Sequence, residues 1–183
     1  MTRFTHRIAT ETDIPAIATL MDRAIEALQR PFLSPAEVVA SRHIMGLDTQ
    51  LVADGTYFVV EENGRLAGCG GWSRRATLYG GDQHASLRDP RLLDPASDPA
   101  RIRAMYTDPD FVRRGIGRLV LSLCEQAAIE AGFRRAELMA TLAGEPLYLA
   151  CGYQPIERVL KPAGENMTVP GVIMGKELAR TSA

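Results

Sequence analysis

The sequence predicts an α/β protein that folds as a single domain over residues 1–183. The chain is 46% hydrophobic, which is enough to build one sizeable core. Apolar, β-rich runs alternate along it with segments whose apolar residues recur at helical spacing. Asn63-Gly64 joins two of the β-rich runs and is a strong hairpin signal. The expected order of elements is β-α-α-β-β-β-α-β-α-β-β.

The N-terminal region predicts an edge strand and two helices. Residues Phe4 to Ala9 alternate as an edge strand does, and Thr12 or Asp13 can then cap a helix with Pro15 in its first turn. A second helix begins at Ser34-Pro35-Ala36-Glu37, because a cap with Glu three residues later is a capping box. The apolar face of the first helix consists of Ile14, Ile17, Met21, Ile25 and Leu28.

The middle of the chain predicts a hairpin followed by a long connection. The hairpin strands are Tyr57 to Glu62 and Arg65 to Trp72, and a third strand covers Ile102 to Thr107. The connection, Thr77 to Arg101, is rich in Asp and Gly and shows little periodicity. Connections of this length are uncommon in compact domains, so we expect this insertion to be functional or disordered.

The C-terminal half predicts two helices and three strands. A helix from Gly117 to Ala131 is expected to pack Leu119, Leu123 and Ala127 inward, and Gly132 can end it. The remaining elements are a strand at Ala136 to Leu142, a short helix at Glu145 to Cys151, and closing strands at Tyr153 to Val159 and Val172 to Leu178.

An anion site is predicted where the third strand meets the long helix, in the segment T-D-P-D-F-V-R-R-G-I-G-R. The first N–H groups of a helix have no internal partner and are partly positive. Gly115 and Gly117 remove side chains that would hold a phosphate away from these amides. Arg113, Arg114 and Arg118 can add positive charge. The best-fitting ligand is a phosphate-bearing cofactor, in particular a pyrophosphate.

This segment resembles the acyl-CoA loop of the GCN5-related N-acetyltransferase (GNAT) superfamily. That loop reads Gln/Arg-x-x-Gly-x-Gly/Ala, and Val112 departs from it at the first position. The resemblance continues in E-P-L-Y-L-A-C-G-Y, where Tyr148 falls on the family Tyr that points at the coenzyme A sulfur. Thr141 stands where many relatives carry an Asn that contacts the pantetheine arm.

The resemblance implies a GNAT-like mixed sheet and an N-acetyltransferase that moves an acetyl group from acetyl-CoA to a primary amine. Tyr148 would be catalytic, because a phenol can protonate the departing thiolate. Amides near Met105 and Thr107 would pair with the pantetheine and polarise the thioester carbonyl. The implied cofactor-binding residues are Met105, Tyr106, Thr107, Val112, Arg113, Arg114, Gly115, Ile116, Gly117, Arg118 and Thr141.

The general base stays open. Many relatives place a Glu on the strand before the loop, but residues 101–107 contain no carboxylate. Glu61 and Glu62 end a hairpin strand, whereas Asp82 and His84 lie in the insertion and could reach the acceptor if it folds over the site. A chain of water molecules without a single base is an equal alternative.

Composition narrows the partners. A net charge of -1 argues against wholesale binding of nucleic acid or an anionic membrane, and it favours a small amine over a histone-like tail. No apolar run approaches the roughly 18–20 residues of a membrane span, and no signal peptide is evident, so a cytoplasmic location is expected. Cys69, Cys124 and Cys151 lack metal-site spacing and are expected to be buried free thiols, with no metal bound.

Two further hypotheses remain. The departures at Val112 and Thr141 and the missing base fit an acyl-CoA-binding sensor or structural module without transferase activity. A generic nucleotide loop fits poorly, since the Lys-Ser/Thr of a P-loop does not follow Gly117. Relatives are often dimers through their C-terminal strands, and Val172 to Met174 is apolar enough to contribute to a homodimer.

Overall fold

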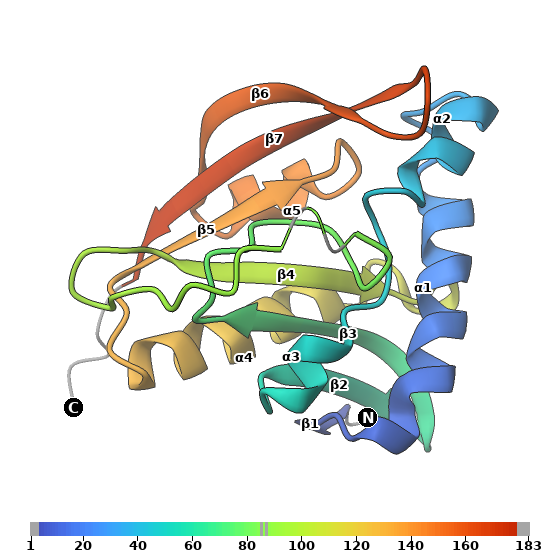
Figure 1. Ribbon diagram of the computed structural model, residues 1–183. Helices are drawn as coiled ribbons and strands as arrows, with labels where there is room; N and C mark the ends of the chain where they lie inside the picture. Colours follow the sequence, from blue (N-terminus) through green and yellow to red (C-terminus); the bar gives the residue numbers. More distant parts are fainter. Residues whose placement is uncertain (1–3, 85, 87, 179–183) are drawn as a thin grey trace.

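A mixed sheet of seven strands, in the order β1-β2-β3-β4-β5-β7-β6, forms the centre of the computed structural model, which describes residues 4–178 except 85 and 87 (Figure 1). Neighbouring strands are antiparallel except for the parallel pair β4 and β5. The predicted α/β fold with a mixed sheet is confirmed. The strands are β1 (Thr5–Ile8), β2 (Tyr57–Glu62), β3 (Arg65–Ser73), β4 (Ala100–Thr107), β5 (Arg135–Ala140), β6 (Gln154–Pro162) and β7 (Thr168–Glu177).

Helices cover both faces of this sheet (Figure 1). One core joins α1 (Ile14–Leu28), α2 (Pro35–Ser41) and α3 (Thr49–Ala53) to the sheet. The other core joins α4 (Ile116–Glu130) and α5 (Glu145–Ala150) to the sheet. No described helix is long and apolar enough to cross a membrane.

Local sequence signals explain several boundaries. Asn63 and Gly64 have φ of 52° and 77°, as the tight turn between β2 and β3 requires. The expected capping box starts α2, because the Glu37 amide donates to Ser34 Oγ at 3.3 Å and the Ser34 amide donates to Glu37 Oε2 at 2.8 Å. Gly132, with φ of 95°, follows α4. These three predictions are confirmed.

The predicted buried face of α4 is wrong, because the residues that face the sheet lie one position further along the helix than expected. Leu119, Leu123 and Ala127 are only partly buried. The reason lies in β3, where a Cβ on Gly68 would meet Ile116 Cγ2 at 2.3 Å. Because glycine lets the helix approach the strand there, the stripe that begins at Ile116 faces the sheet. The buried residues of α4 are Ile116, Val120, Leu121, Cys124 and Ala128.

Helix α3 was not predicted from the sequence. This five-residue helix is capped by Asp48, whose Oδ1 accepts from the Gln50 amide at 3.1 Å. It is too short to show helical periodicity.

Among the cysteines, Cys69 and Cys124 are buried as expected, whereas Cys151 is only partly buried.

Strands β4 and β5 separate shortly after they begin to pair. Only Ala100 pairs with Ala136, and Arg101 with Glu137, so the later part of β4 has no partner on its β5 side. On its other side, β4 carries an irregularity opposite Gly70, where Ala104 has φ of 51°. This separation opens the sheet at its centre.

The described part of the insertion runs along β4 in Figure 1 and is held by specific contacts. Arg75 and Leu92 form an isolated antiparallel bridge, and the Asp89 amide donates to Thr77 Oγ1 at 3.0 Å. Leu93 is buried in the core that contains α4. The described part of the insertion is therefore packed against the rest of the protein by specific contacts.

Candidate active site

The loop before α4 presents a row of backbone amides. Arg113 and Gly115 have left-handed φ of 62° and 85°, and Gly115 is the N-cap of the helix. Among the described residues, none accepts a hydrogen bond from the amides of 113–118. Successive N–H groups in such a turn at a helix N-terminus form an anion site. The predicted geometry of the loop is therefore present in the backbone.

Neighbouring ion pairs hold the turn before this loop. Asp108 Oδ1 accepts from the Asp110 amide at 2.9 Å. Arg23 and Arg65 each approach the Asp108 carboxylate at 3.3 Å. The Arg65 guanidinium also lies over the Phe111 ring, 5.0 Å from its centroid. The D-P-D-F turn is thus fixed from α1 and β3, so the amides that follow it are preorganised.

A cavity of about 880 Å³ leads from this loop into the opening between β4 and β5. It continues to α1, the insertion and β7. Every predicted site residue except Arg114 lines it. The lining residues from the prediction are Met105, Tyr106, Thr107, Val112, Arg113, Gly115, Ile116, Gly117, Arg118, Thr141 and Tyr148.

The three loop arginines differ in their surroundings. Arg114 Nη1 donates to Glu62 Oε2 at 2.9 Å, and its guanidinium lies over the rings of Phe4 and Phe111. Arg113 and Arg118 line the cavity and have no ion-pair partner among the described residues. Of the three, Arg113 and Arg118 are therefore the ones whose charge no described carboxylate offsets.

The unpaired edge of β4 supplies donors beside the cavity. The Asp108 amide donates to the Ala67 carbonyl of β3 at 3.0 Å. Since N–H groups along a regular extended strand point to alternate edges, that of Thr107 points to the open side. Met105, the other residue whose amide was predicted to contact the cosubstrate, lies in the irregular stretch opposite Gly70 and lines the cavity.

Comparison with known proteins decides the family. A model of the acetyltransferase (GNAT) family matches residues 20–153, well over half of the chain. The chain belongs to the GNAT family. The resemblance seen in the loop is confirmed.

Solved structures share the fold at low sequence identity. A GCN5-related N-acetyltransferase structure from Rhodopseudomonas palustris is 19% identical with a TM-score of 0.71, covering 97% of this chain and 98% of that chain. The PaiA N-acetyltransferase of Thermoplasma acidophilum, in complex with coenzyme A, is 12% identical with a TM-score of 0.62 (96% and 99% covered). The yncA structure from Salmonella typhimurium, with acetyl-CoA, is 17% identical with a TM-score of 0.63 (100% and 98% covered). No curated protein is significantly similar in sequence.

In this GNAT chain Tyr148 is 8% exposed and lines the cavity from α5. Its ring packs edge-on against Tyr153, with the centroids 5.9 Å apart. Burial raises the pKa of the Tyr148 phenol, so the hydroxyl keeps its proton at neutral pH. Thr141 also lines the cavity, and its Oγ1 accepts from the Gly144 amide at 3.1 Å.

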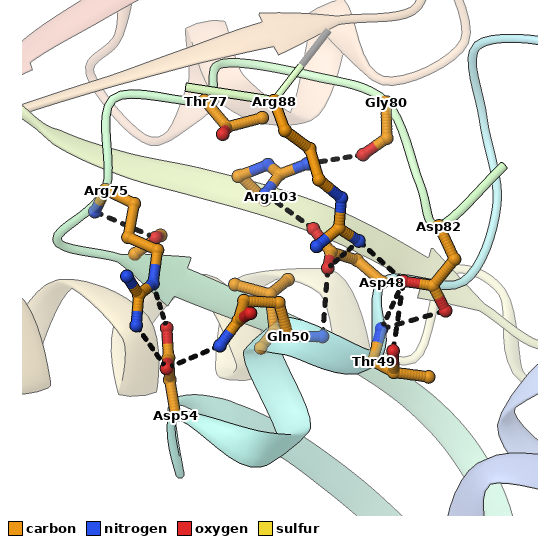
Figure 2. Close-up of polar contacts among 12 residues, drawn as sticks. Asp48, Thr49, Gln50, Asp54, Arg75, Thr77, Gly80, Asp82, Arg88 and Arg103 are labelled. Atoms are coloured by element: carbon orange, nitrogen blue, oxygen red, sulfur yellow. Dashed lines mark hydrogen bonds and ion pairs between the residues drawn. The ribbon is translucent and has the colours of Figure 1, made fainter. Parts of the chain in front are cut away.

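The four candidate bases lie away from the cavity lining. Glu61 pairs with Arg7 at 2.8 Å, and Glu62 pairs with Arg114. Figure 2 shows Asp82 bonded to the Thr49 amide (3.0 Å) and to Arg88 (2.6 Å). His84 does not line the cavity either. Over the described residues, the lining contains no carboxylate and no imidazole, and no group of three or more potential metal ligands occurs.

Two residues of the lining were missed from the sequence. Arg103 of β4 is buried, with Nη1 2.5 Å from Asp48 Oδ2, and it donates to the Gly80 carbonyl (Figure 2). Its burial lowers the pKa of this guanidinium, while Asp48 opposes the shift. Gln29, just after α1, is buried with Nε2 3.5 Å from Thr141 Oγ1. An arginine inside an apolar strand is a signal of a buried partner, but the sequence alone does not identify Asp48.

Proposed function

We propose that the protein is an N-acetyltransferase that transfers the acetyl group of acetyl-CoA to a primary amine on a small molecule, by direct attack in a ternary complex. Membership of the GNAT family supports acyl transfer. The observation that carries the proposal is the continuous cavity that joins the amides of 113–118 to Tyr148 through the gap between β4 and β5. Such a path suits a long cosubstrate with an anionic end and a reactive end.

In the proposed complex the pyrophosphate accepts hydrogen bonds from the loop amides, with Arg113 and Arg118 adding charge. Val112, Gly115, Ile116 and Gly117 contribute backbone to this cradle. Met105, Tyr106 and Thr107 border the pantetheine on one side and Thr141 on the other. Arg114 pairs with Glu62, which offsets its charge, so it contributes to the position of the loop rather than to its potential.

The reaction forms one bond and breaks one. The amine nitrogen attacks the thioester carbon while an amide of the β4 edge stabilises the developing oxyanion. The C–S bond then breaks, and Tyr148 donates its proton to the thiolate. The proton released by the nitrogen returns to the phenolate, directly or through water. Positioning supplies much of the rate, because attack within the complex is effectively unimolecular.

The proposal extends to location, partners and assembly. A single domain acting in the cytoplasm, without a metal, nucleic acid or membrane partner, is consistent with the composition. A homodimer through the C-terminal strands would use other residues than the predicted segment Val172 to Met174. Val172 and Met174 are fully buried within the chain, whereas β6 exposes Ile156 and Leu160. A dimer would therefore use β6.

The first experiment is a calorimetric titration of acetyl-CoA into the protein, with dephospho-coenzyme A as the comparison ligand. We expect one-to-one binding in the micromolar range. Gly117→Glu should weaken it by more than about ten-fold, because a carboxylate would face the phosphates. A circular dichroism spectrum and a melting curve of the variant serve as the control for folding. Unchanged affinity in a folded variant would remove the assignment of the loop.

A sensor that binds acyl-CoA without turnover is the second candidate. The observation that favours it is the lining without carboxylate or imidazole over the described residues. A protein of this kind would bind acetyl-CoA but release no coenzyme A thiol with any amine. The Tyr148 variant described below separates the two functions.

A further inference from the structure

The end of the cavity opposite the anion loop is largely apolar, with Gln29 and Arg103 as its main polar side chains. We call it the acceptor end, since it lies beyond the open edge of β4. It is bordered by α1, by the connections that precede and follow α2, by residues 78–80 and by β7. Its larger side chains are Ile25, Leu28, Phe32, Met45, Tyr79 and Val169. Phe32 is also about half exposed, as expected of a residue at the mouth of a cavity.

The charged side chains that line the cavity are all cationic. Over the described residues these are Arg103, Arg113 and Arg118. Arg113 and Arg118 belong to the anion loop. The charge of Arg103 is balanced by Asp48, a buried residue that does not line the cavity; Figure 2 shows the pair. Lys161 adds another cation nearby, with Nζ 5.0 Å from the centroid of the Tyr79 ring. The other titratable groups of the lining are Tyr79, Tyr106, Tyr148 and Cys69.

Three of these groups, Cys69, Tyr106 and Tyr148, are held in their uncharged form near pH 7. Burial raises the pKa of Cys69 to about 12, and it also raises the pKa of Tyr106 and of Tyr148. An ammonium that enters the cavity would therefore lose its hydration and find no carboxylate to pair with. Burying an unpaired charge is far more costly than burying an uncharged amine.

We propose that the acceptor is an apolar amine that binds as its uncharged free base, with aromatic amines as the class best suited at pH 7. This inference rests on the proposed function and specifies its substrate. The lone pair of an aromatic amine is delocalised into the ring, so the molecule is uncharged at neutral pH. An alkyl ammonium with the pKa of a lysine is neutral in only about one molecule in a thousand.

The inference also accounts for the missing base. A free base already carries its lone pair, so no side chain has to remove a proton before attack. The proton lost later, after the N–C bond has formed, can follow the departing sulfur through Tyr148. A lining without carboxylate or imidazole is then consistent with turnover.

The test compares three amines at pH 7 by thiol release: aniline, benzylamine and spermidine. We expect kcat/KM for aniline to exceed that for spermidine by more than ten-fold. The value for benzylamine should rise about ten-fold per pH unit below its pKa, while that for aniline stays flat. A preference for spermidine over both aromatic compounds would overturn the inference.

Gln29→Glu gives a sharper test, because it places a carboxylate at the acceptor end with almost no change in shape. We expect the ratio of kcat/KM for benzylamine over aniline to rise by at least ten-fold at pH 7. Gln29→Met is the matched control and should leave the ratio unchanged. An unchanged ratio in a folded Gln29→Glu protein would contradict the inference. If Gln29→Glu does not fold, the amine series with the wild-type protein still decides.

Failure of the inference differs from failure of the proposed function. Absence of acetyl-CoA binding in the calorimeter removes both. Acetyl-CoA binding together with a preference for polyamines removes the inference alone. If acetyl-CoA binds but no amine is acetylated, the affinities of aniline and benzylamine for the coenzyme A complex are measured by calorimetry. Tighter binding of aniline supports the free-base pocket, and tighter binding of benzylamine overturns it.

Discussion

Ala104 illustrates how one residue shapes the site. Its φ of 51° lies in the left-handed region, which is unfavourable for a residue with a Cβ. The buried Tyr57 hydroxyl of β2 donates to the Ala104 carbonyl at 2.7 Å and so holds the irregularity from within the core that both residues share. The strain is located where β4 leaves its regular pairing with β3 and borders the cavity. Local strain of this kind is often found at functional sites.

Tyr148→Phe removes the proposed proton donor while keeping the ring that packs on Tyr153. If the protein is an enzyme, kcat should fall about 100-fold, the usual scale for general acid catalysis, with little change in acetyl-CoA affinity. Steady-state thiol release and calorimetry measure the two quantities. Activity equal to that of the wild type would make Tyr148 a packing residue. A wild-type protein with binding but no turnover would favour the sensor.

At the residue scale, the residues of the candidate site could be predicted from the sequence, but the residues that they contact could not. The order of a glycine-containing loop at a helix start indicated the loop residues, and the resemblance to the GNAT family supplied Met105, Thr141 and Tyr148. Sequence reasoning could not separate Arg114 from Arg113, since the partner Glu62 comes from a strand far away in the sequence. The pairing of Arg103 with Asp48 was hidden for the same reason.

At the scale of elements, glycines of β3 determine how closely α4 approaches the sheet. A Cβ on Gly70 would lie 2.7 Å from Met105 Cγ and 2.7 Å from Val120 Cγ1. Gly68 has the same relation to Ile116, the first residue of α4. The N-terminus of α4, which carries the anion loop, is therefore placed by the absence of side chains on β3.

Gly70→Ala should consequently destabilise the fold by about 1–3 kcal/mol, the usual cost of overpacking. The free energy of unfolding from urea titrations measures this. Adding Val120→Ala provides the control, because it removes one of the two clashing atoms. The double variant should be more stable than the sum of the two single effects. Strict additivity would show that the helix does not press on Gly70.

Elements with strong local signals were predictable, and those defined by packing were not. The turn at Asn63-Gly64 and the cap at Ser34 are encoded within a few residues. The sequence near α4 does not determine which face of the helix is buried. The helix carries two adjacent apolar stripes, and packing against β3 decides which of them faces the sheet. Helix α3 has too few residues for periodicity, and only its cap, Asp48, marks it.

For the whole molecule, the ionisable groups fall into two sets with opposite pH effects. Hydrogen bonds from arginines lower the pKa of carboxyl groups, among them those of Asp13, Asp54 and Asp110. Burial raises the pKa of Cys69 to about 12, and it raises that of Tyr57 as well. The first set stabilises the protein above the pKa of unfolded carboxyl groups, about 4. The second set stabilises it below the pKa of an unfolded thiol, about 8.5.

Stability should therefore be greatest between about pH 5 and pH 8.5. It should decline as the pH falls through 4, since the paired carboxylates become protonated. It should also decline between about 9 and 12, because the unfolded chain then releases protons that the folded chain retains. Urea midpoints across the pH range measure this profile. High salt should weaken the acid decline, which depends on exposed ion pairs. A midpoint that does not vary from pH 3 to pH 10 would contradict the assignment.

The overall fold was more predictable than the contacts of single residues, because the sequence pattern gives the order of strands and helices. The course of the insertion was not predictable. Its position depends on contacts such as Thr77 with Asp89 and Arg103 with Gly80, which pattern analysis does not detect.

The short pairing of β4 with β5 has a mechanical consequence. Two residue pairs join the half of the sheet formed by β1 to β4 to the half formed by β5 to β7. A cosubstrate lying in the gap would border both halves and cover the free edge of β4. Amide hydrogens along that edge should therefore exchange more slowly in the acetyl-CoA complex than in the free protein.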